Sequence, residues 1–360
     1  MERTIDSEHV QWREIVAPGL RQPLAAACLG VWLHAADSLL VSTMIPAIVN
    51  EIGGVRLIPW SFALYEIGTI VMGAASGLLS MRFGTRQPMA VAGAVFALGC
   101  LISAMAPQME VLLAGRILQG LGGGALMALS FVVAATRFPH RLSPRVMAAI
   151  STIWGVSALL GPLVGGLFVE FATWRGGFLF FVVQALGLSL WLAVSRDPGD
   201  APTAPDKAEN LPARRLALLC AGVILVAYGG IDVSPLGTGM FVLLGVICLA
   251  VFVRLDSSHE TSRMLPRQPF SLGNPVGAAM VMIACFAAAT TAVSVYVPFL
   301  ITALHGISEL VAGYIIAMEA VAWTLAALLI SGQPERRDPF FILSGMVLIT
   351  VGIACLIPAV

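Results

Sequence analysis

Four ionisable side chains lie near the middle of long apolar stretches. Asp37, Glu66, Arg116 and Glu319 each occupy a segment of about 20 residues, long enough to cross a bilayer, with no other charge in it. A charge at the bilayer centre costs about 2.5–3.5 kcal/mol on insertion scales, so it needs a partner or a task. A buried acid beside a base can bind and release a proton. We therefore predict proton coupling by Asp37, Arg116 and Glu66, with Asp37 and Arg116 paired directly or through one water.

Polar neighbours share helical faces with two of these charges. His34 precedes Asp37 by three residues, and Gln119 follows Arg116 by three, so each pair faces the same way on a helix. We predict that His34, Gln119 and Glu319 contact a substrate. The alternatives are a packed histidine, an arginine that extends to the interface, and acids kept neutral in packed helix contacts.

The elements that position these side chains are predicted to be transmembrane helices. Hydrophobic residues make up 58% of the chain and charged residues 11%, against about 25% charge in a soluble domain. Helices satisfy their own backbone in lipid, so we predict an all-α, polytopic bundle with about 11 transmembrane helices. The apolar runs are 24–46, 58–80, 88–106, 111–136, 146–169, 177–195, 216–231, 236–253, 275–303, 310–332 and 340–360.

The arginines are distributed unevenly between the two ends of these runs. With the N-terminus inside, the outer loops receive only Arg56 and Arg175, and the other loop arginines are inside. This asymmetry predicts a cytoplasmic N-terminus in an inner (plasma) membrane, with the lipid bilayer as the surroundings. The six cysteines lie in apolar runs without metal-ligand or disulfide spacing, so we expect them to be core residues and expect no metal site.

Polar stretches divide the chain into six predicted parts. The parts are a cytoplasmic tail (1–23), a six-helix bundle (24–195), a proline-rich cytoplasmic linker (196–215), two extra helices (216–253), a cytoplasmic loop (254–274) and a partial second bundle (275–360). The order of long helix, outer turn, helix, charged inner turn and helix recurs in the last part, with Pro46 and Pro298 predicted to close the first helix of each copy. Duplicated halves are typical of secondary transporters.

Several classes of protein are disfavoured. A phosphate-binding loop needs a lysine after a glycine run, but the single lysine, Lys207, lies in the linker. No catalytic constellation, metal cluster or basic tail is present in the sequence, so we predict no enzymatic activity, no cofactor and no nucleic-acid partner. Uphill movement of a solute would therefore draw on an ion gradient.

Three motifs follow one another along the first bundle. They are "GLLSMRFGTR" (77–86), "GRILQGLGGGA" (115–125) and "GPLVGG" (161–166). Together they resemble the motifs of the major facilitator superfamily, and the chain is most similar to its fourteen-helix drug:proton antiporters. The resemblance implies gating or structural roles for the motif residues. These are Gly77, Arg82, Gly84, Arg86, Gly120, Gly123, Gly161, Pro162, Gly165 and Gly166.

The chain departs from the family pattern in two ways. Met81 stands where the family has an aspartate that helps to latch the inner gate, and Thr85 replaces an arginine. Measured against that family, we also expect the C-terminal half to be incomplete.

The resemblance implies proton-coupled efflux of drug-like, amphipathic or cationic molecules, with a small-molecule substrate and protons as partners. In the family the "GPLVGG" element marks exporters more than importers, and its glycines would form a smooth face for the opposing half. The alternatives are a proton-coupled importer of a small polar solute and a truncated, non-transporting membrane protein.

Overall fold

The computed structural model describes residues 11–195, 213–231, 234–259, 263–306 and 309–356. Within these ranges the secondary structure is helical, with no strand. Most of the predicted linker and the first ten residues of the predicted tail lie outside them. The last four residues of the predicted run at 340–360 do so as well.

Eleven long helices account for the predicted apolar runs in the described part of the chain, which confirms the all-α prediction. Nine of them have the length and hydropathy to cross a membrane, and α10 and α11 contribute shorter described apolar stretches. The long helices are α2 Arg21–Ile52, α3 Ile58–Phe83, α4 Arg86–Ala104, α5 Met109–Arg137, α6 Ser143–Phe171, α7 Trp174–Val194, α8 Ala213–Ile231, α9 Pro235–Ser257, α10 Pro275–His305, α11 Glu309–Ile330 and α12 Asp338–Leu356.

The prediction that proline closes the first helix of each copy is wrong. Pro46 lies inside α2, which continues to Ile52, and α10 continues past position 298 to His305. Proline removes one backbone hydrogen bond from a helix. Ending the helix at that depth would expose several backbone groups to hydrocarbon, so continuing the helix costs less.

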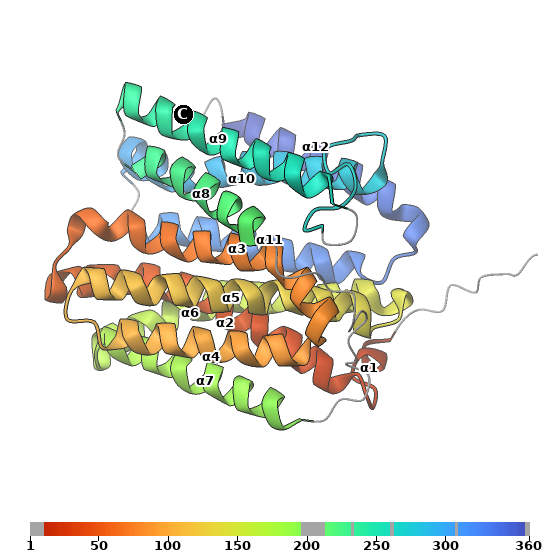
Figure 1. The fold of residues 1–360 in the computed structure, drawn as a ribbon, viewed down its shortest axis with the longest axis horizontal. Helices are drawn as coiled ribbons and strands as arrows, with labels where there is room; N and C mark the ends of the chain where they lie inside the picture. Colours follow the sequence, from red (N-terminus) through yellow and green to blue (C-terminus); the bar gives the residue numbers. More distant parts are fainter. Residues whose placement is uncertain (1–10, 196–212, 232–233, 260–262, 307–308, 357–360) are drawn as a thin grey trace, which may run out of the picture. The chain divides into compact units, whose positions relative to one another are not determined.

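The chain forms two compact units. Of the described residues, the smaller unit comprises 11–17, 139–155, 268–306 and 309–356, and the larger unit comprises 18–138, 156–195, 213–231, 234–259 and 263–267. In the larger unit α5 packs against α2, α3 and α4, while α7 packs against α4 and α2. Figure 1 shows α3, α5, α4 and α7 side by side in that order. The α8–α9 hairpin is also part of this unit, with α8 packed along α3.

The smaller unit contains the short helix α1 (Trp12–Ile15) and the end of the α5–α6 connection. The Glu14 carboxylate accepts a hydrogen bond from Arg141 at 2.6 Å. The Arg145 guanidinium lies 4.8 Å from the centre of the Trp12 ring and donates to Ser331 at 3.0 Å. The backbone N–H of Gln11 and the Arg141 guanidinium hold the pKa of Glu14 below its usual value. These contacts attach α1 to the beginning of α6.

The closest helix contacts in the larger unit are made by glycines of α5. A Cβ at Gly120 would overlap the Tyr65 carbonyl group of α3, and one at Gly124 would overlap the backbone of Thr69 on the same helix. On the α4 side, a Cβ at Gly122 would lie 2.5 Å from the Phe96 nitrogen. All three neighbours are backbone atoms, so α5 meets α3 and α4 with almost no side chain between them, as in other small-residue helix contacts.

Gly120→Ala is expected to lower the free energy of unfolding. The added methyl group meets backbone, so the helices must separate, and overpacking of this kind costs about 1–3 kcal/mol. Thermal unfolding in detergent measures the effect. Gly73→Ala on α3 is the matched control, because a Cβ there has no atom within 4 Å. We expect it to be neutral or slightly stabilising, since alanine favours helix over glycine. Equal stability of the two variants would contradict the proposed backbone contact.

Candidate functional site

An ion pair lies within the helix packing of the larger unit. Asp37 on α2 accepts a hydrogen bond from Arg116 on α5, with Nη1 2.8 Å from Oδ2. Both side chains are 0% exposed. The sequence-based expectation that these two charges pair directly or through one water agrees with this geometry. An unpaired charge at such a buried position would be strongly destabilising.

The Arg116 guanidinium is held by more than the carboxylate. Its Nη1 also donates to the Gln119 side-chain oxygen one turn along α5. Its Nε donates to the Ser61 carbonyl oxygen on α3 at 3.2 Å. The guanidinium carbon lies 4.2 Å from the centre of the Tyr65 ring, a cation–π contact. Arg116 therefore joins α2, α3 and α5, which a planar guanidinium does better than the point charge of a lysine.

Tyr65 connects Arg116 to His34. Its hydroxyl donates to the His34 carbonyl oxygen at 2.9 Å, and His34 Nδ1 lies 2.9 Å from the same hydroxyl. Gly123 makes room for this contact, since a Cβ there would lie 3.1 Å from the hydroxyl.

Gln119 extends the network to a fourth helix. Its side-chain nitrogen donates to the Ser103 hydroxyl near the end of α4, at 3.1 Å. Sequence reasoning identified Asp37, Arg116, His34 and Gln119 but missed three other members of the site: Ser61, Tyr65 and Ser103. A tyrosine hydroxyl within an apolar span is a weak signal that could have directed attention to Tyr65.

Two atoms of the ion pair have no hydrogen-bond partner among the described residues. They are Asp37 Oδ1 and Arg116 Nη2, and both are buried. A second buried ion pair, Arg215 with Asp256 at 2.8 Å, provides a contrast. There the carboxylate also accepts from the backbone nitrogens of Met264 and Leu265, so each of its oxygens is satisfied. The Asp37 carboxylate retains one oxygen that can accept a proton.

The described hydrogen bonds of Arg116 within the larger unit go to other residues than the remaining predicted acids, Glu66 and Glu319. Glu66 follows Tyr65 on α3, and its side chain is exposed. Glu319 is an exposed residue of α11, in the smaller unit. His34 and Gln119, predicted to contact a substrate, are almost fully buried here and support the ion pair.

The α3–α4 turn carries the first motif. Gly84 ends α3 with φ 72°, a value that favours glycine. Arg86 donates to the Leu192 carbonyl oxygen of α7 at 3.0 Å, which ties the turn to α7. Arg82 packs on the Phe83 ring at 5.2 Å. Gly77 has open space where a Cβ would project.

The third motif lies in α6, with Pro162 inside the helix. A Cβ at Gly161 would lie 3.0 Å from Leu39, and one at Gly165 would overlap the Thr43 hydroxyl, both on α2. These two glycines therefore contact α2, a helix of the same half. A surface of small residues allows this close approach. A Cβ at Gly166 would meet no atom within 4 Å, so that position is open.

Comparison with known proteins identifies the family. The sequence model of the Major Facilitator Superfamily matches residues 27–360. A probable multidrug-efflux transporter of Mycobacterium tuberculosis is 30% identical over 323 residues, which are 89% of this chain and 68% of that protein. The multidrug efflux pump SdrM of Staphylococcus aureus is 26% identical over 302 residues, 83% of this chain and 66% of the pump.

Solved structures show the same fold. The proton:xylose symporter XylE matches with a TM-score of 0.54 at 17% identity, covering 86% of this chain and 69% of the symporter chain. A peptide transporter of the POT type matches with a TM-score of 0.54 at 15% identity, covering 94% and 72%. With its family-model match over most of its length, the chain belongs to the Major Facilitator Superfamily of multi-pass membrane transporters.

Proposed function

We propose that the chain acts in proton-coupled efflux of drug-like, amphipathic or cationic small molecules across a plasma membrane. The observation that carries the proposal is the buried Asp37–Arg116 pair, with one carboxylate oxygen, Oδ1, left without a hydrogen-bond partner among the described residues. The 30% identity to a probable multidrug-efflux transporter and the "GPLVGG" element support efflux as the direction.

The coupling step follows from the geometry of the pair. Oδ2 is occupied by Arg116, so an incoming proton binds Oδ1 and neutralises the carboxylate. Arg116 then keeps its contacts to Gln119 and Ser61 but loses the opposite charge. The Arg116 charge favours the ionised form of Asp37, and burial favours the neutral form. Binding or release of the proton at Asp37 therefore shifts the balance between the inward-facing and outward-facing states of the transporter. Gln119 and Tyr65 position the guanidinium throughout.

Substrate-dependent proton flux in liposomes tests this function. The full chain is reconstituted, a proton gradient is imposed, and a panel of cationic dyes is added in turn. We expect at least one dye to increase proton flux and to move against the proton gradient. Proton flux that follows the addition of small polar solutes, with co-directional solute uptake in oriented vesicles, would favour a proton-coupled importer. No flux with any compound would contradict transport by this chain.

The orientation of the chain gives a separate expectation. The arginine asymmetry favours a cytoplasmic α5–α6 connection, on the same side as the N-terminus. A single cysteine at position 141, in a background without the native cysteines, should resist an impermeant thiol reagent applied outside intact cells. It should react after permeabilisation, since Arg141 is exposed. Ready labelling from outside would contradict the orientation.

A further inference from the structure

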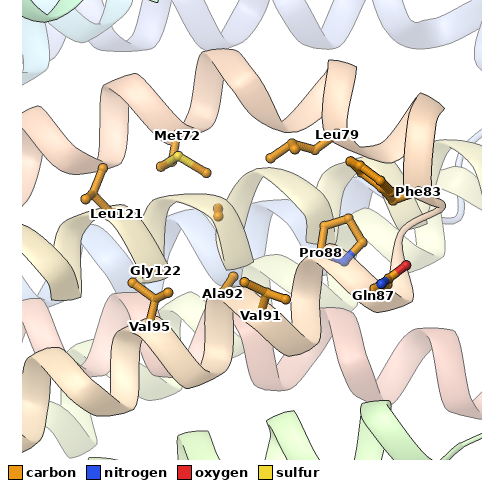
Figure 2. A pocket seen from close by; sticks show the side chains of 11 residues that line it. Met72, Leu79, Phe83, Gln87, Pro88, Val91, Ala92, Val95, Leu121 and Gly122 are labelled. Carbon is orange, nitrogen blue, oxygen red and sulfur yellow. The ribbon is translucent and has the colours of Figure 1, made fainter. Parts of the chain in front are cut away.

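An apolar cavity of about 390 Å³ opens between α3, α4 and α5. Figure 2 shows Met72, Leu79 and Phe83 of α3 along one side of it. The opposite side is formed by α4, where Val91 is 59% exposed and marks the opening. Residues of α5 complete the lining, among them Leu121. The wall is almost entirely carbon, so it suits a hydrocarbon and not a polar solute.

The length of this cavity matches one leaflet of a bilayer. The wall on α3 runs from Phe83, at the α3–α4 turn, to Met72. At 1.5 Å per residue, that stretch of helix rises about 16 Å. The hydrocarbon core is about 30 Å thick, so each leaflet contributes about 15 Å. The cavity therefore has about the depth of one acyl chain.

A cation lies next to the end of the cavity that Phe83 lines. Arg82 precedes Phe83 and contacts its ring, and among the described residues it has no ion-pair or hydrogen-bond partner. The next arginine of the turn, Arg86, is instead occupied by carbonyl oxygens of the α7 end. The residue before Arg82 is Met81, which supplies no carboxylate. The turn therefore presents an uncompensated positive charge beside an opening for a hydrocarbon chain.

We propose that this cavity and Arg82 together bind one anionic phospholipid. An acyl chain lies along α3 and α4, and the headgroup phosphate pairs with the guanidinium, which binds phosphate well through its planar fork. A free phosphate would leave the apolar wall unused, and a neutral lipid would leave the charge unused. This inference goes beyond the proposed transport function and does not depend on it.

Native mass spectrometry of the full chain in detergent tests the site. The chain is titrated with phosphatidylglycerol or with phosphatidylcholine of the same acyl chains. We expect tighter first binding of phosphatidylglycerol. Arg82→Gln should weaken it about tenfold, the value of one charge-assisted hydrogen bond. Arg56→Gln, an exposed arginine before the other end of α3, is the charge-matched control and should have no effect.

The acyl part of the site is tested by filling the opening. Val91→Trp should weaken phosphatidylglycerol binding, whereas Val183→Trp, at an α7 position that is 73% exposed, should not. Met81→Asp should also weaken it, because the new carboxylate would pair with Arg82. If one lipid uses both parts, the effects of Arg82→Gln and Val91→Trp should not add.

Four results would overturn the proposal. The first is equal affinity for the two lipids in the unaltered chain. The second is an unchanged affinity in Val91→Trp, which would mean that only the headgroup binds. The third is competition by glycerol phosphate at the affinity of the lipid, which would indicate a free-phosphate site. The fourth is displacement of the lipid by a cationic dye, which would assign the cavity to a drug-like molecule.

Discussion

Asp37→Asn is expected to abolish proton-coupled efflux and to leave some substrate binding. The amide has the size of the carboxylate, and its oxygen still accepts a hydrogen bond from Arg116, whose Nη1 lies 2.8 Å from the native oxygen. The amide does not titrate, so no proton exchanges at Oδ1. The measurement is efflux of a cationic dye from proteoliposomes as a function of pH, with dye binding measured separately.

Asp256→Asn is the control for this variant. Asp256 is also buried in an ion pair, with Arg215, but both of its oxygens are occupied and it lies at the end of the α8–α9 hairpin. We expect Asp256→Asn to lower stability while leaving the pH profile of efflux unchanged. Normal pH-dependent efflux by Asp37→Asn would remove Asp37 from the coupling mechanism, and Glu66 would become the next candidate.

Arg116→Ala is expected to produce the largest loss of stability. Removing one partner of a buried pair leaves an uncompensated charge, at a cost of about 3–5 kcal/mol in the free energy of unfolding. The double variant Asp37→Asn/Arg116→Ala should be more stable than Arg116→Ala alone, because no buried charge remains at the site. Thermal unfolding of the four proteins in detergent gives the coupling between the two positions.

Arg116→Lys distinguishes charge from geometry in the same series. A lysine restores the charge, but it does not reach Asp37, Gln119 and the Ser61 carbonyl together. We expect most of the stability to return and efflux to return only in part. Additive effects of Asp37→Asn and Arg116→Ala would contradict the direct pair, and full efflux by Arg116→Lys would contradict a role for the planar contacts.

Hydropathy predicted the helices well because each span must satisfy its own backbone in lipid. The Asp37–Arg116 pair was predictable for a related reason, since two isolated intramembrane charges lower their cost by meeting. The Pro46 prediction failed because a local helix-breaking tendency is weaker than the cost of exposed backbone in lipid.

Other parts of the site depend on how the helices rotate about their axes, which the sequence pattern does not specify. Tyr65 and Ser61 meet Arg116 only because α3 turns this face toward α5. The same applies to Gly161 and Gly165, whose small surfaces fit either α2 or the opposing half. Glu66 and Asp37 are both single acids in apolar runs, but Asp37 is buried and Glu66 is exposed. The neighbour of Glu66 on α3, Tyr65, is buried, so the burial of an acid depends on which way the helix faces.

The glycine contacts of α5 have a mechanical consequence. Backbones that touch directly leave no flexible side chains to absorb a displacement, and packed interiors are poorly compressible. The contacts at Gly120, Gly122 and Gly124 therefore make α3, α4 and α5 stiff with respect to one another. We therefore expect α3 and α4 to move together with α5 when Arg116 shifts. The α3–α4 turn would then move together with the ion pair.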